Sequence, residues 1–289
     1  MIILEQELLS RHTTFRIGGP ATYYVIPEKI EEVKEGIAFA KERNLPFYIV
    51  GKGSNMLFSD EGYEGVVIEI GKGLEKVEIQ DDGVVNVQAG TSMSVMAAKV
   101  AEEGLTGFEF AGGIPGTLGG GIAMNAGAYG GEIKDCIMSA TVLTEEGEIL
   151  TLSKEQLELG YRTSIIQKKR YIVLDAKFSF QNGNSEEIKA KMRELNGQRR
   201  EKQPLEYPSA GSTFKRPEGY FAGKLIQDAG LRGYRVGDAQ VSEKHCGFVV
   251  NRGNATAQEV NQLIQDVQKK VKEEFQVELE PEVRMVGKF

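Results

Sequence analysis

The stretch AGGIPGTLGGGIAMNAGAYGG, residues 111–131, holds nine glycines in twenty-one residues. Glycine at this density costs conformational entropy on folding, so a structural or ligand-binding requirement should select it. A flexible linker would mix glycine with serine and other polar residues, whereas Ile114, Leu118 and Ile122 are interleaved here. This mixture predicts a tightly turned backbone whose N–H groups converge on an anion or lie against a flat ring.

A second glycine loop, GKGSN at residues 51–55, follows the apolar run FYIV and has the same character. Two such loops predict a large cofactor with a diphosphate. The usual dinucleotide fingerprint is absent, because GKGSNM fails G-x-G-x-x-G at its last position and neither loop carries the P-loop Gly-Lys-Ser/Thr. On the glycines alone, both loops can equally be crowded structural turns, and that alternative stays open.

The bulk composition bounds the class of protein. A chain of 289 residues suits two or three domains, and a net charge of −7 without a Lys/Arg tract argues against nucleic-acid binding. Cys136 and Cys246 are the only cysteines and no zinc-ligand spacing occurs, so we expect no metal site and a reducing cytoplasm. The sequence also predicts no signal peptide and no membrane span, which would need about 20 apolar residues.

The first two thirds of the chain alternate strand and helix patterns. A helix with one apolar face is predicted over residues 28–44, and strands at 47–51 and 65–70 complete a βαβ-like unit. The other expected elements are hairpins turning at Gly83 and Gly147, a helix over 94–104 closed by Gly104, and a strand over 171–180.

The last third changes character. The polar stretch QNGNS (181–185) is typical of a linker, and a charged helix follows it and ends before Pro204. Thr256 and Glu259 form a capping box before a helix with an apolar stripe. VELEPEVRMVG (277–287) predicts a closing strand, with Pro281 at a sheet edge or strand end.

The order of several motifs along the chain carries a resemblance. They are TTFRIGGPA (13–21), VGKGSNMLFSD (50–60), the glycine-rich stretch, GYRTS (160–164), AGSTFKRP (210–217), AGKLIQDAGLRG (222–233), FVVN (248–251) and LEPEVRMVG (279–287). In this order they resemble the UDP-N-acetylenolpyruvoylglucosamine reductase (MurB) family, flavoenzymes of peptidoglycan precursor synthesis. The resemblance covers nearly the whole chain, and the glycine motif together with LEPEVR gives it most of its specificity.

The resemblance implies an α+β fold. Residues 1–75 and 76–180 are then two subdomains of an FAD-binding module of the vanillyl-alcohol-oxidase (PCMH) type. Residues 185–289 form a C-terminal α/β substrate-binding domain, whose last strand can return to the FAD module. Only QNGNS separates the second subdomain from the third-domain helix, so the chain resembles the short, type II form. Substrate contacts made from the insertion of the longer form are therefore not carried over.

The resemblance also implies a reaction. NADPH first gives a hydride to FAD and leaves, and the reduced flavin then delivers it to the methylene carbon of UDP-N-acetylglucosamine enolpyruvate, which yields UDP-N-acetylmuramate. Negative charge develops on the alpha carbon and its carboxylate. The site must therefore supply a cation for the carboxylate, an acid for the alpha carbon and a flavin held over the alkene.

Three residues match the family's catalytic motifs. Arg162 in GYRTS binds the carboxylate with a rigid, charged fork, and Ser212 in AGSTF protonates the alpha carbon. Glu282 in LEPEVR helps to stabilise the enolic intermediate, and alternation along a strand predicts that Glu280 and Arg284 face the same way. From the residues alone, a surface ion pair, a turn serine and a solvated face remain open for the three positions.

The resemblance further implies non-covalent FAD, the substrate and NADPH at one shared pocket. The expected cofactor-binding residues are Gly51, Lys52, Gly53, Ser54, Asn55, Gly112, Gly113, Ile114, Pro115, Gly116, Gly119, Gly120, Asn125, Ala126 and Gly127. The expected substrate-binding residues are Tyr161, Lys202, Arg216 and Lys224, of which Lys224 is the favoured diphosphate contact. Solvated lysines and a core tyrosine are the alternatives at these positions, and neither His12 nor His245 is assigned a catalytic role.

Two other functions remain open from the sequence. One is an FAD-dependent oxidase of the same fold that uses oxygen, and the other is a flavin- or nucleotide-binding protein without chemistry. We expect a cytoplasmic monomer that binds neither nucleic acid nor membrane.

Overall fold

The computed structural model describes residues 1–289. The chain forms two compact units: unit 1 comprises residues 1–4, 24–52 and 66–199, and unit 2 comprises residues 5–23, 53–65 and 200–289. The chain passes between the units inside GKGSN, after Lys52. This division differs from the three ranges expected from the sequence, because most of the charged helix α5 (Ser185–Lys202) belongs to unit 1. The three-domain division itself stays a prediction.

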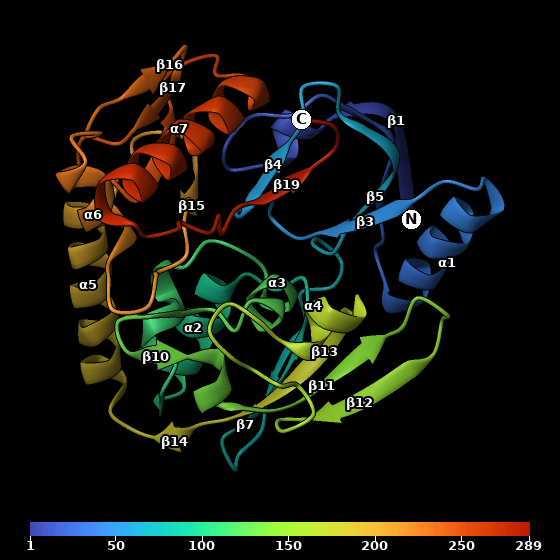
Figure 1. The fold of residues 1–289 in the computed structure, drawn as a ribbon. Helices are drawn as coiled ribbons and strands as arrows, with labels where there is room; N and C mark the ends of the chain where they lie inside the picture. The colour runs from blue at the N-terminus through green and yellow to red at the C-terminus, as the bar shows by residue number, and fades with distance from the viewer. The chain divides into compact units, whose positions relative to one another are not determined.

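The centre of unit 1 is an antiparallel sheet of order β12-β11-β13-β7-β6 (Figure 1). Alternate residues of β7, such as Val85 and Val87, are buried, as a half-buried strand requires. The strands are β6 (Val77–Ile79), β7 (Val84–Gln88), β11 (Ile137–Leu143), β12 (Ile149–Ser153) and β13 (Ile172–Ser179). Both expected hairpins are confirmed, with Gly83 at a φ of 79° and Gly147 at 94° in their turns.

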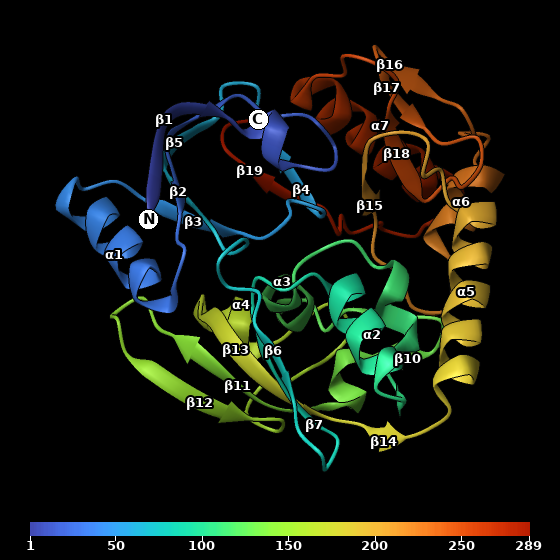
Figure 2. The same cartoon turned by 180° about the vertical axis from the view of Figure 1, so that it is seen from behind.

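Helix α3 (Leu118–Ala123) packs on this sheet, and both views place it beside β13 (Figures 1 and 2). Helix α2 (Met93–Glu102) packs against η2 and β8. The helix α2 ends at Glu102, and Gly104, two residues further on, has the φ of 69° that suits the expected glycine stop. The short elements of unit 1 are β8 (Leu105–Thr106), η2 (Glu109–Gly113), β9 (Gly127–Ala128), β10 (Gly131–Glu132), η3 (Ile133–Asp135), α4 (Ile165–Lys169) and β14 (Gln181–Asn182).

A second sheet has the order β1-β2-β5-β3 and is accompanied by helix α1 (Ile30–Glu42). Its strands are β1 (Ile2–Leu8), β2 (Pro20–Ile26), β3 (Phe47–Val50) and β5 (Tyr63–Glu69). The expected strands β3 and β5 pair in parallel, with Phe47 opposite Val66. The helix α1 buries Val33, Ile37 and Ala40, which is the apolar face that its sequence predicts.

Unit 2 contains an antiparallel sheet of order β15-β18-β17-β16, helices α6 (Ala222–Asp228) and α7 (Ala257–Phe275), and the 3-10 helix η1 (Leu9–His12). The strands are β15 (Ser209–Ser212), β16 (Arg235–Val236), β17 (Ala239–Val241) and β18 (Phe248–Asn251). The predicted stripe of α7 is confirmed, because Val260, Leu263 and Val267 are fully buried. Strands β4 (Met56–Phe58) and β19 (Arg284–Val286) form a parallel pair in the same unit.

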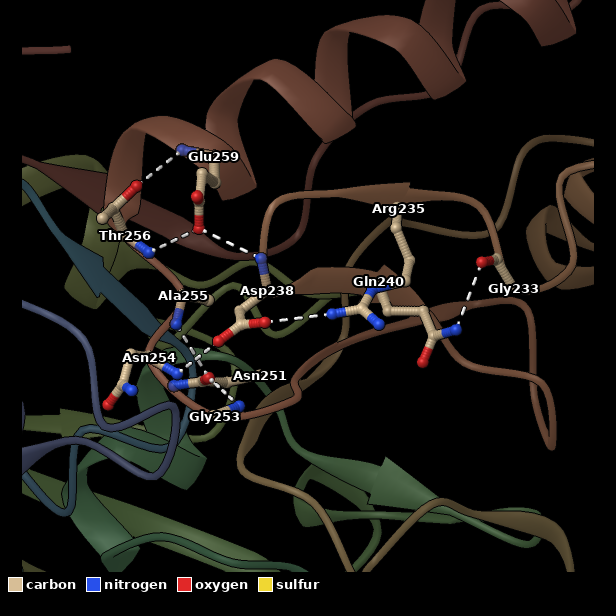
Figure 3. Close-up of polar contacts among 10 residues, drawn as sticks. All are labelled: Gly233, Arg235, Asp238, Gln240, Asn251, Gly253, Asn254, Ala255, Thr256 and Glu259. Atoms are coloured by element: carbon tan, nitrogen blue, oxygen red, sulfur yellow. Dashed lines mark hydrogen bonds and ion pairs between the residues drawn. The ribbon is translucent and has the colours of Figure 1, made fainter.

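The first turn of α7 is held by a network of polar contacts (Figure 3). The capping box is confirmed: Glu259 N donates to Thr256 Oγ1 at 3.1 Å, and Thr256 N donates to Glu259 Oε2 at 3.0 Å. The same Oε2 accepts from Asp238 N, which ties the β16–β17 hairpin to the helix (Figure 3). The carboxylate of Asp60 accepts from the two amides between the capping-box residues, Ala257 N at 2.8 Å and Gln258 N at 3.0 Å. The helix therefore starts with its N–H groups satisfied.

One expectation for local structure is confirmed only in part, and another is wrong. The closing strand covers only residues 284–286, and upstream of it Pro281 makes only an isolated bridge to Phe214. Pro281 has no N–H to give to a ladder, and Glu282 N donates to Thr213 O instead. The argument that Glu280 and Glu282 share a strand face therefore fails. The stretch QNGNS is not a linker, since β14 pairs with β8 and α5 begins at Ser185.

The structure also describes the cysteines, the side chains that could bind a metal ion, and the length of the helices. Both cysteines are free and buried, and burial raises the pKa of the Cys136 thiol to about 12. No group of His, Cys, Asp or Glu side chains is arranged to hold a metal ion. None of the helices is long and apolar enough to cross a membrane.

Candidate functional site

The two glycine loops meet in unit 1. A Cβ atom built on Gly51 would lie 2.3 Å from Thr117 Oγ1, so only glycine allows the loop after β3 to approach the glycine-rich stretch this closely. Lys52 Nζ donates to Ser92 Oγ, and Ser92 in turn forms an isolated bridge with Thr117. Gly51 and Lys52 of the GKGSN loop therefore lie against residues next to or within the glycine-rich stretch, Ser92 and Thr117.

Several of the other glycines lie in close contact with side chains of helices α2 and α5. A Cβ atom at Gly112 would lie 2.9 Å from Met192 Cε, and one at Gly113 would lie 2.5 Å from Asn196 Oδ1. At Gly121 the obstacle is Met93 Sδ at 2.6 Å. The alternative of crowded structural turns therefore holds for part of this stretch, where α2 and α5 approach the backbone.

Gly120 is different. It is exposed in the first turns of α3, and a Cβ atom there would meet nothing nearer than Thr117 Oγ1 at 3.6 Å, an ordinary contact. Neither packing nor backbone strain explains why this helical position carries no side chain. A flat or phosphate-bearing group lying against this face of α3 would explain it, so the residues present fit an FAD cofactor. Gly116, at a φ of 136°, supplies the turn that leads into the helix.

The predicted carboxylate-binding residue Arg162 lies on a tight turn of unit 1. Tyr161 beside it is 55% exposed, and the Arg162 guanidinium carbon lies 5.4 Å from the centroid of the Tyr161 ring. Arg162 itself has a φ of 55°. The glycine-rich stretch runs directly beside this turn, because Asn125 Nδ2 donates to Gly160 O at 3.1 Å. The turn that carries Arg162 is therefore hydrogen-bonded to the glycine-rich stretch.

The other predicted catalytic pair lies in unit 2. Ser212 ends β15 opposite Phe248, and its hydroxyl makes no hydrogen bond within the protein. The next residue, Thr213, accepts from Glu282 N through its carbonyl at 2.8 Å and donates its own N–H to Gly247 O at 2.8 Å. The main chains of Ser212 and Glu282 are thus neighbours, while Arg162 belongs to unit 1.

Asn55 lies on the other side of Glu282. Its Nδ2 atom donates to Glu282 O at 3.1 Å, and its carbonyl accepts from Arg284 N at 2.9 Å. The side chain that the sequence assigns to the cofactor therefore already contacts the LEPEVR segment. This contact uses one of the two N–H donors of the Asn55 amide, so the second N–H and the main-chain N–H remain for a phosphate.

The cations predicted for the nucleotide end of the substrate all lie in or next to unit 2. Lys224 forms an exposed ion pair with Asp228 one helical turn away, an arrangement that contributes little and that a diphosphate can displace. Arg216 lies over the Phe221 ring at 3.9 Å from its centroid. Lys202 is exposed at the end of α5.

Arg199 was not found from the sequence. Its Cδ atom lies 3.1 Å from the position of a Cβ atom on Gly113, and burial lowers the pKa of its guanidinium. It forms no ion pair with an acidic side chain. The signal was available, because Met192, Leu195 and Arg199 follow one another at spacings typical of one helix face.

The two residues His245 and Cys246 are packed rather than activated. His245 Nδ1 accepts from Gly247 N at 3.1 Å, the ring lies edge-on to Phe248, and burial lowers its pKa. Burial also raises the pKa of the Cys246 thiol. Cys246 is therefore a buried packing residue.

Comparison with known proteins defines the class. Residues 21–153 match a family described as an FAD binding domain, and residues 203–286 match one described as UDP-N-acetylenolpyruvoylglucosamine reductase, C-terminal domain. A solvent-stable cholesterol oxidase shares the fold alone, at a TM-score of 0.50 and 16% identity over 63% of this chain and 38% of its own. The chain is thus an FAD-dependent oxidoreductase with the expected α+β fold.

Its relatives define the family. The reductase of Lachnoclostridium phytofermentans is 62% identical over 97% of this chain and 92% of its own length, and that of Agathobacter rectalis is 55% identical over 99% and 95%. The crystal structure of the enzyme (MurB) from Thermus caldophilus matches at a TM-score of 0.84 and 35% identity, covering 98% of this chain and 99% of its own. The chain belongs to the UDP-N-acetylenolpyruvoylglucosamine reductase family, and it reduces the enolpyruvyl group in peptidoglycan precursor synthesis.

Proposed function

We propose that the chain converts UDP-N-acetylglucosamine enolpyruvate into UDP-N-acetylmuramate, with NADPH as the hydride donor. Bound FAD supplies the hydride-transfer chemistry, and the protein supplies binding, orientation and charge. The observation that carries this proposal is the meeting of the two glycine loops at Gly51 and Thr117, beside the open face at Gly120. The main-chain N–H groups of the two loops would bind the cofactor diphosphate, and the Arg199 guanidinium would add positive charge near it.

Three side chains perform the protein's part of the reaction in this proposal. Arg162 binds the substrate carboxylate through two parallel N–H groups and stabilises the charge that develops there. Ser212 donates a proton to the alpha carbon, and its hydroxyl is available because no protein group holds it. Glu282 acts at the same carbon, and its hydrogen bonds to Asn55 and Thr213 keep its main chain beside the serine.

The remaining assignments concern the ligands' other ends. The cofactor-binding residues are the two glycine loops as predicted, with Asn125 contributing through its backbone. Tyr161 lies beside the reacting end of the substrate, and Lys202, Arg216 and Lys224 bind its nucleotide end. We also propose that NADPH and substrate use one pocket in turn, that the chain is a monomer, and that it works in the cytoplasm. Alternate use of one pocket requires ping-pong kinetics.

The experiment that tests this function separates the two half-reactions of the FAD-loaded protein. In Ser212→Ala, flavin reduction by NADPH should stay nearly intact, because the serine acts only after the donor has left. Flavin reoxidation by the enolpyruvyl substrate should slow by roughly 10²–10⁴-fold, as for loss of a positioned acid. Ser209→Ala, in the same strand, is the matched control. Equal losses in both half-reactions would refute the role of Ser212.

A further inference from the structure

The turn that carries Arg162 has a conformation that needs support. Gly160 N donates to Thr163 O at 3.1 Å and Thr163 N donates to Gly160 O at 3.3 Å, so the chain reverses over two residues. Arg162, the second of these, has a φ of 55°, in the left-handed region that arginine rarely adopts. Such a conformation persists only where the surrounding structure holds it. Two side-chain amides contact the carbonyl groups of this turn.

Asn125 contacts the first carbonyl. Its Nδ2 atom donates to Gly160 O at 3.1 Å and to Glu132 Oε2 at 2.7 Å, and its Oδ1 atom accepts from Lys134 N at 3.0 Å. The residue is 1% exposed. Both N–H donors of this amide are therefore used inside unit 1, which leaves the side chain no N–H to offer to a cofactor phosphate.

Gln167 of α4 contacts the second carbonyl. Its Nε2 atom donates to Arg162 O at 3.2 Å, to Ala123 O, at the end of α3, at 2.5 Å, and to Met124 Sδ at 3.3 Å. Ser164 Oγ donates to the same Ala123 carbonyl at 2.7 Å. The turn is thus tied on both sides to residues 123–125 of the glycine-rich stretch.

We propose that Asn125 and Gln167 are positioning residues for Arg162. Each amide holds one carbonyl of the turn, and together they fix the main chain from which the guanidinium extends. The proposal rests on the proposed role of Arg162 in binding the substrate carboxylate. It assigns to the end of the glycine-rich stretch a second task, because the segment that holds the cofactor also sets the place of the carboxylate-binding side chain.

The first test exchanges Gln167. Gln167→Leu removes the hydrogen bonds that Nε2 donates to Ala123 O, Met124 Sδ and Arg162 O at similar volume, whereas Gln167→Lys restores N–H donors one bond further along the side chain. In Gln167→Leu we expect the KM for the enolpyruvyl substrate to rise roughly tenfold, with the Kd of FAD unchanged. Gln167→Lys should recover most of the loss. Gln156→Leu, the same exchange at an exposed site of unit 1, is the matched control and should change neither constant.

The second test exchanges Asn125. Asn125→Asp is isosteric and tolerates the φ of 42°, but it replaces the amide donor by a carboxylate that faces Glu132. The double exchange Asn125→Asp with Glu132→Gln removes that repulsion and leaves Gly160 O without its side-chain donor, with only the bond from Thr163 N. We therefore expect the double variant to regain thermal stability while its KM for the enolpyruvyl substrate stays raised.

A readout independent of activity is hydrogen exchange of the amides at Gly160 and Thr163 in the FAD-free protein. Exchange should be faster in Gln167→Leu and return to the wild-type rate in Gln167→Lys. If the exchange rates in Gln167→Leu equal those of the wild type, the proposal is overturned, even if the variant is inactive. A weaker FAD affinity with an unchanged KM in the double variant would also overturn it, and would identify Asn125 as a cofactor contact. A wild-type protein that leaves the enolpyruvyl substrate unreduced would instead refute the proposed function.

Discussion

The exchange Gly120→Ala tests whether the open face of α3 is the cofactor's. The new methyl group meets nothing nearer than Thr117 Oγ1 at 3.6 Å, so the protein itself can accept it. Alanine is better than glycine inside a helix by about 0.5–1 kcal/mol. The cofactor-free protein should therefore become slightly more stable, by at most this amount because α3 is short.

The effect on FAD should have the opposite sign. If the cofactor lies against Gly120, the methyl group overlaps it, and overpacking of this kind costs about 1–3 kcal/mol. At 1.4 kcal/mol for each factor of ten, the Kd of FAD should rise by about 5- to 150-fold. A gain in stability together with a loss of affinity is a combination that general damage to the fold cannot produce.

The matched control is Gly197→Ala in α5. This glycine is also helical, and a Cβ atom there would meet nothing within 4 Å. It should bring a similar gain in stability and leave the Kd of FAD unchanged. The chain contains no tryptophan, so FAD binding is best followed by the fluorescence of the flavin, and unfolding by circular dichroism in urea. An unchanged Kd in Gly120→Ala would refute the assignment of this face to the cofactor.

Three further predictions concern other parts of the chain. Arg162→Lys should raise the KM for the enolpyruvyl substrate roughly tenfold or more despite the retained charge, because the fork is lost, and wild-type steady-state kinetics would remove Arg162 from the site. The thiols of Cys136 and Cys246, whose pKa values are raised by burial, should resist iodoacetamide at pH 8 and react once urea unfolds the chain; fast labelling of the native protein would contradict their burial. Asp60→Ala should lower the free energy of unfolding by about 1–3 kcal/mol, because two amide groups of α7 lose their acceptor. Asp81→Ala, in an exposed turn, should not lower it. Equal effects of the two exchanges in urea unfolding would argue against the role of Asp60 at the start of α7.

Local signals in the sequence predicted the regular elements well. The turns at Gly83 and Gly147 need a positive φ, which the glycines reveal without any knowledge of the fold. The start of α7 was equally predictable from the sequence, because the capping box involves only Thr256 and Glu259, which lie three positions apart in the chain.

Long-range pairing is what the sequence failed to predict. The LEPEVR segment alternates like a strand, yet the N–H of Glu282 pairs with Thr213 and its carbonyl with the side chain of Asn55. Likewise, QNGNS has a linker composition, but Gln181 and Asn182 pair with β8. In both cases the partner lies far away along the chain, where composition and periodicity carry no information.

The candidate site divides in the same way. Motif resemblance was enough to choose Arg162, Ser212 and Glu282, and to expect two cooperating glycine loops. It could not show that Asn125 supports the arginine turn, because that depends on which carbonyl the folded chain brings to the amide. Arg199 was missed because it stands in a run of charges. Its spacing from Met192 and Leu195 placed it on their helix face, but its contact with Gly113 follows from the way α5 packs.

The most direct test is an anaerobic titration of the wild-type protein loaded with FAD. NADPH should bleach the flavin absorbance near about 450 nm, and one equivalent of UDP-N-acetylglucosamine enolpyruvate should then restore it with formation of one equivalent of UDP-N-acetylmuramate. A flavin that NADPH cannot bleach, or a reduced flavin that only oxygen reoxidises, would contradict the proposed reaction.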